Sequence, residues 1–352
     1  MTEFPLLVRL NSSCGINDFD ASPIFDEIGD NYNYTAYSLE NGTRLYFEVE
    51  YWNTTEESAF IWVKIPAISA TENTTVYLWF EKFVDGSAYN NASMVWDNNF
   101  VMVQHMNDAT TSTILDSTSN DNAGTKTAAN EPIEAVGKIG SDQDFAPDND
   151  QVTITDNTSL DIANAITLSA LVNGDVFVHG MQFVGKQAAY MLAKRLTAPT
   201  DGVYFQVYVD GAYRYPNAYA SQTISAGSFY KLDMTYDSVT RTINAYINGS
   251  LIDSKLLTGL GSYTIGTNNN NLFVGGRYIA WYDGKIDEVR LSNIARSTAW
   301  IGVSYETQRD NLIYYSGPEK GYSTDEVLGV AAIALVVALM AAALVLIYSS
   351  KK

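Results

Sequence analysis

Apolar side chains recur at every second position through most of this chain, and this period of two constrains the fold more than any other feature. The stretch from Arg44 to Tyr51 alternates polar and apolar residues, as a strand with one buried face does. Residues 59–65 (AFIWVKI) and 76–80 (VYLWF) are apolar on both faces, which is typical of central strands in a sandwich. The pattern therefore predicts an all-β fold for the part of the chain before the C-terminal segment.

Turn-forming dipeptides divide the second half into hairpins. Each follows a strand-like run, and the three pairs are Asp210-Gly211, Asn248-Gly249 and Asp283-Gly284. Such pairs favour the positive φ angles of tight two-residue hairpin turns. Residues 108–130 are instead polar and rich in Thr, Asn and Asp, so we expect a long surface loop there.

The C-terminus carries an unbroken apolar run from Val327 to Ile347, followed by a tail that ends in Lys351 and Lys352. As a helix, this run would rise about 32 Å, which suffices for a hydrocarbon core of about 30 Å. The terminal lysines mark the cytoplasmic side. We predict a stalk at 317–326, a single transmembrane helix at 327–348 and a cytoplasmic tail at 349–352. A buried core helix is the less favoured alternative, because core helices rarely run this long without a charge.

This topology places the rest of the chain on the extracellular face of a cell membrane or on a virion membrane, in a single-pass protein with its C-terminus inside. No signal peptide is visible, since Met1-Thr-Glu leads directly into the strand-like FPLLVRL. Three readings stay open: a processed or truncated form, a misplaced start, or insertion through the C-terminal helix alone.

Charge and cysteine content narrow the class of partner. Asp and Glu number 40 against 21 Lys and Arg, so binding to nucleic acid is disfavoured. Cys14 is the only cysteine, which excludes an intramolecular disulfide and favours a prokaryotic, archaeal or viral surface. Glycosylation is expected where the machinery exists. The Asn-x-Ser/Thr sequons are at Asn11, Asn33, Asn41, Asn53, Asn73, Asn91, Asn157 and Asn248.

Four segments near the N-terminus, in this order and spacing, resemble a prokaryotic family, domain of unknown function 2341. The segments are FPLLVRL at 4–10, GTRLYFEVEYWN at 42–53, AFIWVKIPAI at 59–68 and TTVYLWFE at 74–81. That family commonly precedes laminin-G-like modules in archaeal, bacterial and viral surface proteins. The resemblance implies an N-terminal β-sandwich domain over 1–97, although its members usually begin with one or two further strands.

From Val101 onward, the chain is similar to a concanavalin A-like, laminin-G-type jelly roll, which we predict over 98–316. The segments that carry this resemblance are VMVQHMND at 101–108, the Asp-rich turn and strands at 148–173, FYKLDMTYD at 229–237, INAYINGSLI at 243–252 and the closing stretch at 272–301. The run GKIDEVRL at 284–291 is the most telling, because Gly-x-Ile-Asp-Glu-Val-Arg is that family's recurrent closing strand. The fold hosts lectins, adhesins, carbohydrate-binding modules and glucanases, so it does not fix the function.

Hydrolysis is disfavoured by the distribution of carboxylates and histidines. A retaining glycosidase of this fold needs two carboxyls about 5 Å apart, from a Glu-x-Asp-x-x-Glu run, and the chain has none. Asp287 and Glu288 are strand neighbours, which point to opposite faces. His105 and His179 accompany no serine-hydrolase or zinc motif. We interpret His105 as structural and His179 as a loop residue, and we predict no enzymatic activity.

A structural calcium ion is a better candidate than a catalytic site. Jelly rolls of this type often hold Ca²⁺ with oxygens from an Asp-rich turn and a returning strand, as the resemblance implies for Asp148, Asp150 and Asp287. The alternative is that the turn cluster only caps its own backbone.

Two aromatic clusters are candidates for ligand binding, because sugars stack on rings and hydrogen-bond to neighbouring polar groups. The candidate residues are Tyr213, Tyr215, Asn217 and Tyr219 in one cluster and Tyr278 and Trp281, next to Tyr282, in the other. Core packing or shielding of strand edges is the alternative for these rings. The sequence thus predicts a membrane-anchored surface recognition or adhesion protein for glycans or glycoproteins of another surface. A structural envelope or virion spike protein, including a homo-oligomer, is the main rival, and a polysaccharide hydrolase is the least favoured.

Overall fold

The computed structural model describes residues 1–111, 113–126, 131–197, 200–216, 224–276, 278–317, 319–320 and 331–337. They form two compact units, the first made of residues 1–97 with the described residues after Gly302, and the second made of residues 98–302. Strands account for most of the regular structure in both units, so the predicted all-β class is confirmed.

The first unit contains two antiparallel sheets. One has the order β1-β5-β4, and the other has the order β22-β24-β6-β2-β3, with β23 also paired to β24. The rings of Tyr37 in β2 and Phe47 in β4 are fully buried and lie 5.1 Å apart, so the sheets face each other across a core. The strands of this unit are β1 (Thr2–Leu10), β2 (Thr35–Leu39), β3 (Arg44–Leu45), β4 (Phe47–Asn53), β5 (Ser58–Ala67), β6 (Thr74–Phe80), β22 (Ile313–Tyr315), β23 (Glu319–Lys320) and β24 (Ala331–Val337).

Short helices connect these strands. They are α1 (Ser22–Ile28), α2 (Ala92–Val95), the 3₁₀ turn η1 (Tyr32–Tyr34) and α3 (Thr298–Gln308), which crosses the boundary between the units. The predicted strands at 59–65 and 76–80 are confirmed as parts of β5 and β6.

The stretch from Arg44 to Tyr51, predicted as one strand, is divided between the two sheets. β3 pairs with β2, whereas β4 pairs with β5 and shifts register between Val49 and Tyr51. Leu45 and Phe47 are both buried, so the alternation survives the change of sheet. Alternation with a period of two predicts which side chains are buried, but it does not predict which sheet their strand belongs to.

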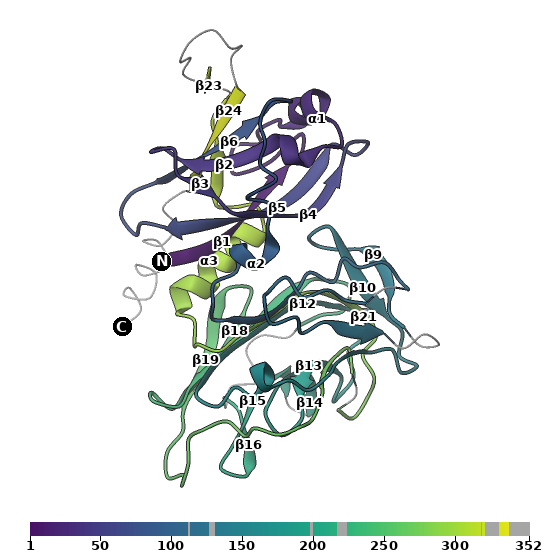
Figure 1. Cartoon of the computed structure of the whole chain (residues 1–352). Coiled ribbons are helices and arrows are strands. Elements are labelled where there is room, and N and C mark those ends of the chain that lie inside the picture. Colours follow the sequence, from purple (N-terminus) through teal and green to yellow (C-terminus); the bar gives the residue numbers. More distant parts are fainter. Residues whose placement is uncertain are drawn as a thin grey trace. The chain divides into compact units, whose positions relative to one another are not determined.

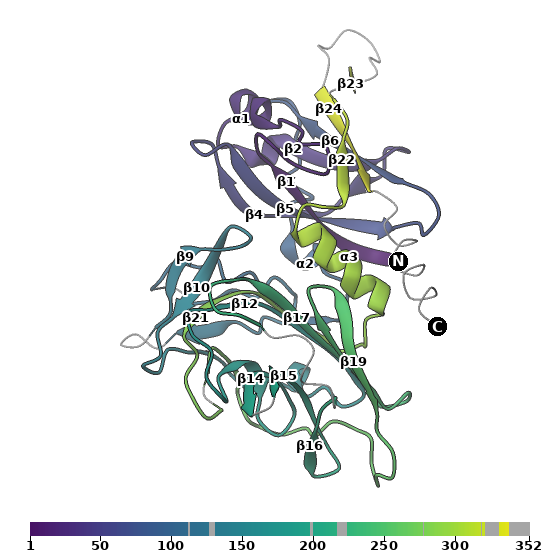
Figure 2. The same cartoon turned by 180° about the vertical axis from the view of Figure 1, so that it is seen from behind.

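The chain returns to the first unit after α3. Figures 1 and 2 show the yellow strands β22 and β24 among the purple strands of that unit. The backbone N–H of Leu7 donates to Thr307 Oγ1 at 2.9 Å, and that of Gly15 donates to Asp310 Oδ2 at 2.9 Å. Residues 303–316, predicted to close the second domain, therefore belong to the first unit, because their hydrogen bonds hold them there.

Strand β24 corrects the prediction of a helix for the part of 327–347 that the structure describes. It pairs with β6 from Ala331 opposite Phe80 to Val337 opposite Thr74, and with β22 on its other side. A run of alanine, valine, leucine and isoleucine has no periodicity that separates strand from helix, and β6 provides the pairing edge. The rest of the predicted span lies outside the described residues. Within the described part of the chain, we find no helix with the length and apolar content needed to cross a membrane.

The second unit is a sandwich of two larger antiparallel sheets. The eight-stranded sheet has the order β19-β18-β17-β12-β21-β10-β9, with β7 also paired to β21, and the seven-stranded sheet has the order β16-β15-β14-β13-β20-β11-β8. Figure 1 shows the layer that contains β12 above the layer that contains β13, β14 and β15. The strands are β7 (Phe100–Gln104), β8 (Gly124–Lys126), β9 (Ile133–Val136), β10 (Ser141–Phe145), β11 (Val152–Ile154), β12 (Ala165–Gly174), β13 (Gln182–Lys186), β14 (Tyr190–Thr197), β15 (Thr200–Val209), β16 (Ala212–Arg214), β17 (Tyr230–Asp237), β18 (Thr242–Ile247), β19 (Ser250–Leu256), β20 (Leu272–Val274) and β21 (Gly284–Ser292).

A single apolar core lies between these sheets. Phe205 and Val207 from β15 enter it from one side, and Leu232 and Met234 from β17 enter it from the other. Alternate residues of each strand therefore face the core, and the residues between them face outward. This arrangement confirms the predicted sandwich.

Two of the three predicted hairpin turns are confirmed. Asp210 and Gly211 have φ angles of 52° and 71°, and Asn248 and Gly249 have φ angles of 50° and 74°, as type I′ turns require. They join β15 to β16 and β18 to β19. The third prediction is wrong, because the strands on either side of Asp283-Gly284 belong to different sheets. Gly284 instead allows a close approach, since an added Cβ would lie 2.3 Å from the Asn173 carbonyl oxygen.

The predicted surface loop at 108–130 is more ordered than its composition indicates. It contains β8, which pairs with β11, and Ile114 is fully buried. The carboxylate of Asp116 accepts three backbone N–H groups at 2.8 to 3.0 Å. In much of this segment, side-chain acceptors therefore bind the backbone N–H groups in place of a neighbouring strand. A polar composition does not distinguish such an ordered segment from a surface loop.

Candidate functional site

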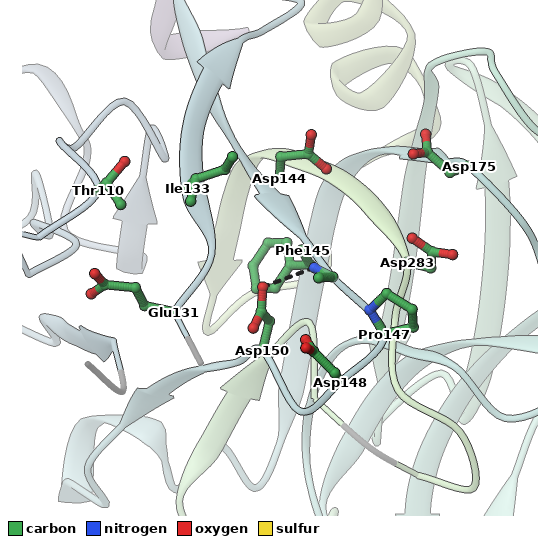
Figure 3. A pocket seen from close by; sticks show the side chains of 11 residues that line it. Thr110, Glu131, Ile133, Asp144, Phe145, Pro147, Asp148, Asp150, Asp175 and Asp283 are labelled. Atoms are coloured by element: carbon green, nitrogen blue, oxygen red, sulfur yellow. Dashed lines mark hydrogen bonds between the residues drawn. The ribbon is translucent and has the colours of Figure 1, made fainter. Parts of the chain in front are cut away.

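An acidic pocket of about 550 Å³ lies beside the turn between β10 and β11 of the second unit. Figure 3 shows carboxylates from several segments around this hollow, with the Asp150 carboxylate bonded to the chain beside Phe145. That bond is donated by the Ala146 N–H at 2.8 Å. The acidic residues of the lining are Glu131, Asp144 at the end of β10, Asp148 and Asp150 in the turn, Asp175 after β12 and Asp283 before β21.

The pocket carboxylates raise one another's pKa. Burial is the first cause for Asp144, Asp150 and Asp283. The charge of Asp175 adds to the rise at Asp144 and Asp283, and the charge of Asp148 adds to it at Asp150. Crowded carboxylate oxygens are the ligands that Ca²⁺ prefers, and a bound cation would relieve their repulsion. In the described part of the chain, no three of these carboxylates bring oxygens within 4.8 Å of one another, so a calcium ion in the pocket stays a prediction.

Asp287, predicted to share the ion with Asp148 and Asp150, is not in the pocket lining. It is fully buried in β21, and its Oδ2 accepts the backbone N–H groups of Lys138 at 3.1 Å and Ile139 at 3.0 Å. The structure therefore places Asp148 and Asp150 in the same pocket, whereas Asp287 lies outside the pocket lining and binds other backbone groups. This carboxylate ties the β9–β10 connection to β21.

Glu288, the next residue of β21, is held in a buried ion pair. Its Oε1 lies 2.7 Å from His105 Nδ1, and its Oε2 accepts from Arg290 Nε at 2.8 Å. Burial raises the pKa of Glu288, but the charges of Arg290 and His105 outweigh it and lower the pKa to about 2. A φ angle of 52° at Glu288 goes with a register shift against β12, so a bulge sets the direction of this carboxylate.

Five tyrosines gather outside the seven-stranded sheet, and we call this group the tyrosine face. Its members are Tyr204, Tyr208, Tyr213, Tyr215 and Tyr278. Tyr204 and Tyr208 alternate in β15 with core residues, so they point away from the core. The ring centroids of Tyr204 and Tyr215 are 5.5 Å apart, and those of Tyr208 and Tyr213 are 5.2 Å apart.

The tyrosine face unites the two aromatic clusters that the sequence placed apart. Burial raises the pKa of Tyr204 and Tyr213, and the nearby Tyr278 adds to the rise at both. Tyr278 is 39% exposed, and the other four rings are partly exposed rather than part of the core. Tyr213 also has an anchoring contact, because its hydroxyl accepts the N–H of Ala188 at 2.8 Å. Core packing is therefore excluded for these rings.

The remaining predicted ligand residues do not extend this group. Asn217 and Tyr219 lie outside the described residues. Trp281 is partly buried in the loop that carries Tyr278, and Tyr282 is fully buried, with its ring 5.4 Å from Phe183 in the core.

The architecture agrees with a comparison against protein families. Residues 147–302 match the concanavalin A-like lectin/glucanases superfamily, laminin G type. Residues 36–122 match domain of unknown function 2341. The predicted order of the two modules is therefore confirmed. No curated protein matches the chain.

Solved structures with a similar arrangement of strands share little sequence with the chain. Domain 4 of AbnA, an extracellular arabinanase from Geobacillus stearothermophilus in complex with arabinotriose, is 18% identical, with a TM-score of 0.46 over 58% of this chain and 97% of that domain. The binding domain of Paraclostridial Mosquitocidal Protein 1 is 14% identical, with a TM-score of 0.47 over 64% of this chain and 62% of that one. The receptor-binding domain of botulinum neurotoxin mosaic serotype C/D is 11% identical, with a TM-score of 0.46 over 66% and 61%.

Several residues of both sites were missed in the sequence. In the concanavalin A-like segment, Tyr204 and Tyr208 carried a usable signal, because they occupy the outward positions of a predicted strand. Asp175 and Asp283 carried none, since they are far apart in sequence and are held together by the hydrogen bond from the Asp175 N–H to the Asp283 carbonyl. Such pairing between distant loops has no local pattern.

The eight sequon asparagines are all at least partly exposed. Asn157 and Asn248, the two within the concanavalin A-like segment, also accept backbone N–H groups, from Ser159 at 3.0 Å and Lys231 at 2.9 Å. Whether any sequon carries a glycan stays a prediction.

Proposed function

We propose that the protein is a surface recognition or adhesion protein that binds glycans through the tyrosine face of its concanavalin A-like segment. The observation that carries this proposal is the gathering of five tyrosines on the outside of a sheet, where none of them is needed for the core. Rings that are partly exposed beside polar groups suit the apolar C–H faces and the hydroxyls of a sugar. The proposed activity is binding without hydrolysis.

Two of these tyrosines offer a direct test. We expect Tyr215→Ala and Tyr278→Ala each to weaken binding by about 1–3 kcal/mol, which is roughly a 5- to 150-fold rise in Kd, because each removes a stacking surface. Folding stability should change little, since neither ring belongs to the core. The measurement is calorimetric titration of the full-length chain in detergent with the tightest oligosaccharide from a glycan array.

A matched control is Tyr314→Ala, which removes a tyrosine that is 47% exposed in the first unit. Binding that survives in both variants, in chains with an unchanged melting temperature, would remove the tyrosine face from the proposal. A chain that binds no glycan but assembles by itself in sedimentation would favour the structural envelope protein instead.

The acidic pocket supports a second part of the proposal, a structural Ca²⁺ held mainly by carboxylates. Because the pKa values of Asp144, Asp150 and Asp283 are raised, the stability these groups contribute is present at acidic pH and is lost as pH rises through the raised pKa values. A cation offsets that loss only when the carboxylates are ionised. We therefore expect calcium to raise the melting temperature at pH 7 and to have little effect near pH 4. At a concentration 100 times Kd, the gain is about 2.7 kcal/mol.

Scanning calorimetry in calcium and in chelator at the two pH values measures this difference. Asp150→Asn keeps the acceptor for the Ala146 N–H and removes one charge, so it should reduce the calcium effect. Asp121→Asn, at an exposed position outside the pocket, should not. Identical melting curves with calcium and chelator at pH 7 would contradict the site.

A further inference from the structure

Basic side chains converge on the tyrosine face of a strongly acidic protein. The chain has a formal net charge of −19, yet the guanidinium of Arg195 lies 5.2 Å from the Tyr204 ring centroid and the ammonium of Lys255 lies 5.7 Å from that of Tyr215. The ring of His179 is 6.3 Å from that of Tyr204. Two adjacent rings thus meet three basic groups.

These basic groups come from separate parts of the second unit. Arg195 is in β14, Lys255 is in β19 and His179 lies in the connection between β12 and β13. The β14 and β19 strands belong to different sheets, so the convergence does not follow from one strand's alternation. It depends on the way the sandwich brings these three segments to one pair of rings.

Arg195 also acts on the Tyr204 hydroxyl. Burial raises the pKa of Tyr204, whereas the charge of Arg195 and a side-chain hydrogen bond with it lower that pKa. Asp253, two residues before Lys255 in β19, is the acidic group on the same strand. The pocket carboxylates of Asp144, Asp148 and Asp150 belong to the separate site around the β10–β11 turn.

A cation stacked on a ring keeps its N–H groups at the edge of that ring. A guanidinium carries five N–H donors in a fixed fork that matches a carboxylate, and an ammonium carries three. The two rings lie 5.5 Å apart at an interplanar angle of 67°, and a cation lies over a face of each, so a sugar that contacts their remaining surfaces can bring an acidic group at its rim to these cations. A neutral sugar would use the rings alone.

We propose that the tyrosine face selects carboxylate-bearing glycans, such as oligomers of uronic acids, with the sugar ring on Tyr204 and Tyr215 and the carboxylate between Arg195 and Lys255. This inference rests on the proposed glycan binding and adds the class of ligand. The methyl ester of a uronic acid has nearly the same shape without the charge. It therefore separates recognition of the charge from recognition of the sugar.

The test is calorimetric titration of the full-length chain in detergent with galacturonate, glucuronate and mannuronate oligomers and with their methyl esters. We expect the acid of at least one pair to bind at least about 10-fold more tightly than its ester, because a hydrogen bond to a charged group outweighs a neutral one. Its affinity should also fall as salt is added.

Variants assign the effect to the named residues. Arg195→Gln and Lys255→Gln should each reduce the ratio of acid to ester affinity and leave the affinity for the ester unchanged. Tyr215→Ala should weaken both ligands alike. As a matched control, Lys138→Gln removes an exposed lysine from the connection between β9 and β10 and should alter neither affinity.

Three results would overturn the inference, and they are distinguishable. Equal binding of acid and ester would leave glycan recognition in place but remove selection by charge. Sulfated oligosaccharides that bind as tightly as the uronates would remove the preference for carboxylate. No binding to any acid, ester or glycan-array ligand would show that the proposed function itself fails.

Discussion

Replacing Glu288 by alanine is expected to lower the free energy of unfolding of the second unit by about 3–5 kcal/mol. The side chain is 1% exposed and bonds to both His105 and Arg290, so its removal takes a charge-assisted hydrogen bond from each of these buried residues. Since the pKa of Glu288 is lowered to about 2 in the folded chain, its contribution is present above the ordinary carboxyl pKa and is lost as pH falls toward 2. Urea unfolding at pH 7 and pH 3 measures both the cost and its pH dependence.

Two further variants isolate the cause. Glu288→Gln keeps the shape of the side chain and removes its charge. It should therefore lower the free energy of unfolding by most of the amount expected for Glu288→Ala. Glu134→Ala removes an exposed carboxylate from β9 and should change stability by less than about 0.5 kcal/mol. A loss below about 1 kcal/mol for Glu288→Ala would mean that solvent reaches this ion pair in the folded chain.

Deleting residues 327–352 is expected to lower the melting temperature of the first unit, because the deletion removes β24, which lies between β22 and β6. Strand β6 then loses the partner that pairs with it from Ala331 opposite Phe80 to Val337 opposite Thr74. Scanning calorimetry of the full-length and truncated chains measures this shift.

A control for this deletion is a chain that ends after Tyr348 and removes only the charged tail. It keeps β24 and should melt at the same temperature as the full-length chain. An unchanged melting temperature after deletion of residues 327–352 would show that β24 adds no stability to the sheet.

The sequence predicted those features of the fold that depend on local pattern. The Asn248-Gly249 turn was predictable because only a few residues adopt two successive positive φ angles. The inward and outward faces of β15 were equally readable from alternation. Position 284 resembled another such turn, but its glycine is required by the nearby Asn173 carbonyl, which lies in a distant part of the chain.

The candidate sites also depend on contacts between distant parts of the chain, which local pattern does not predict. Asp148 and Asp150 were found because they share one turn, whereas Asp175 and Asp283 reach the pocket from other strands. Asp287 was expected beside them, but its carboxylate faces the backbone of the β9–β10 connection. A bulge at the next residue changes which way the chain presents its side chains, and a period of two does not predict where such an extra residue falls.

The first unit is discontinuous, and this affects the order in which the protein can be made. Its sheet order β22-β24-β6 joins strands that lie on either side of the whole second unit in the sequence. At a synthesis rate of about 5–20 residues per second, the roughly 230 residues between β6 and β22 take about 12–46 s to translate. By the end of this interval the second unit has been synthesised, while β6 still lacks β24 on one side. The half of the protein that is translated first is therefore the last to finish folding.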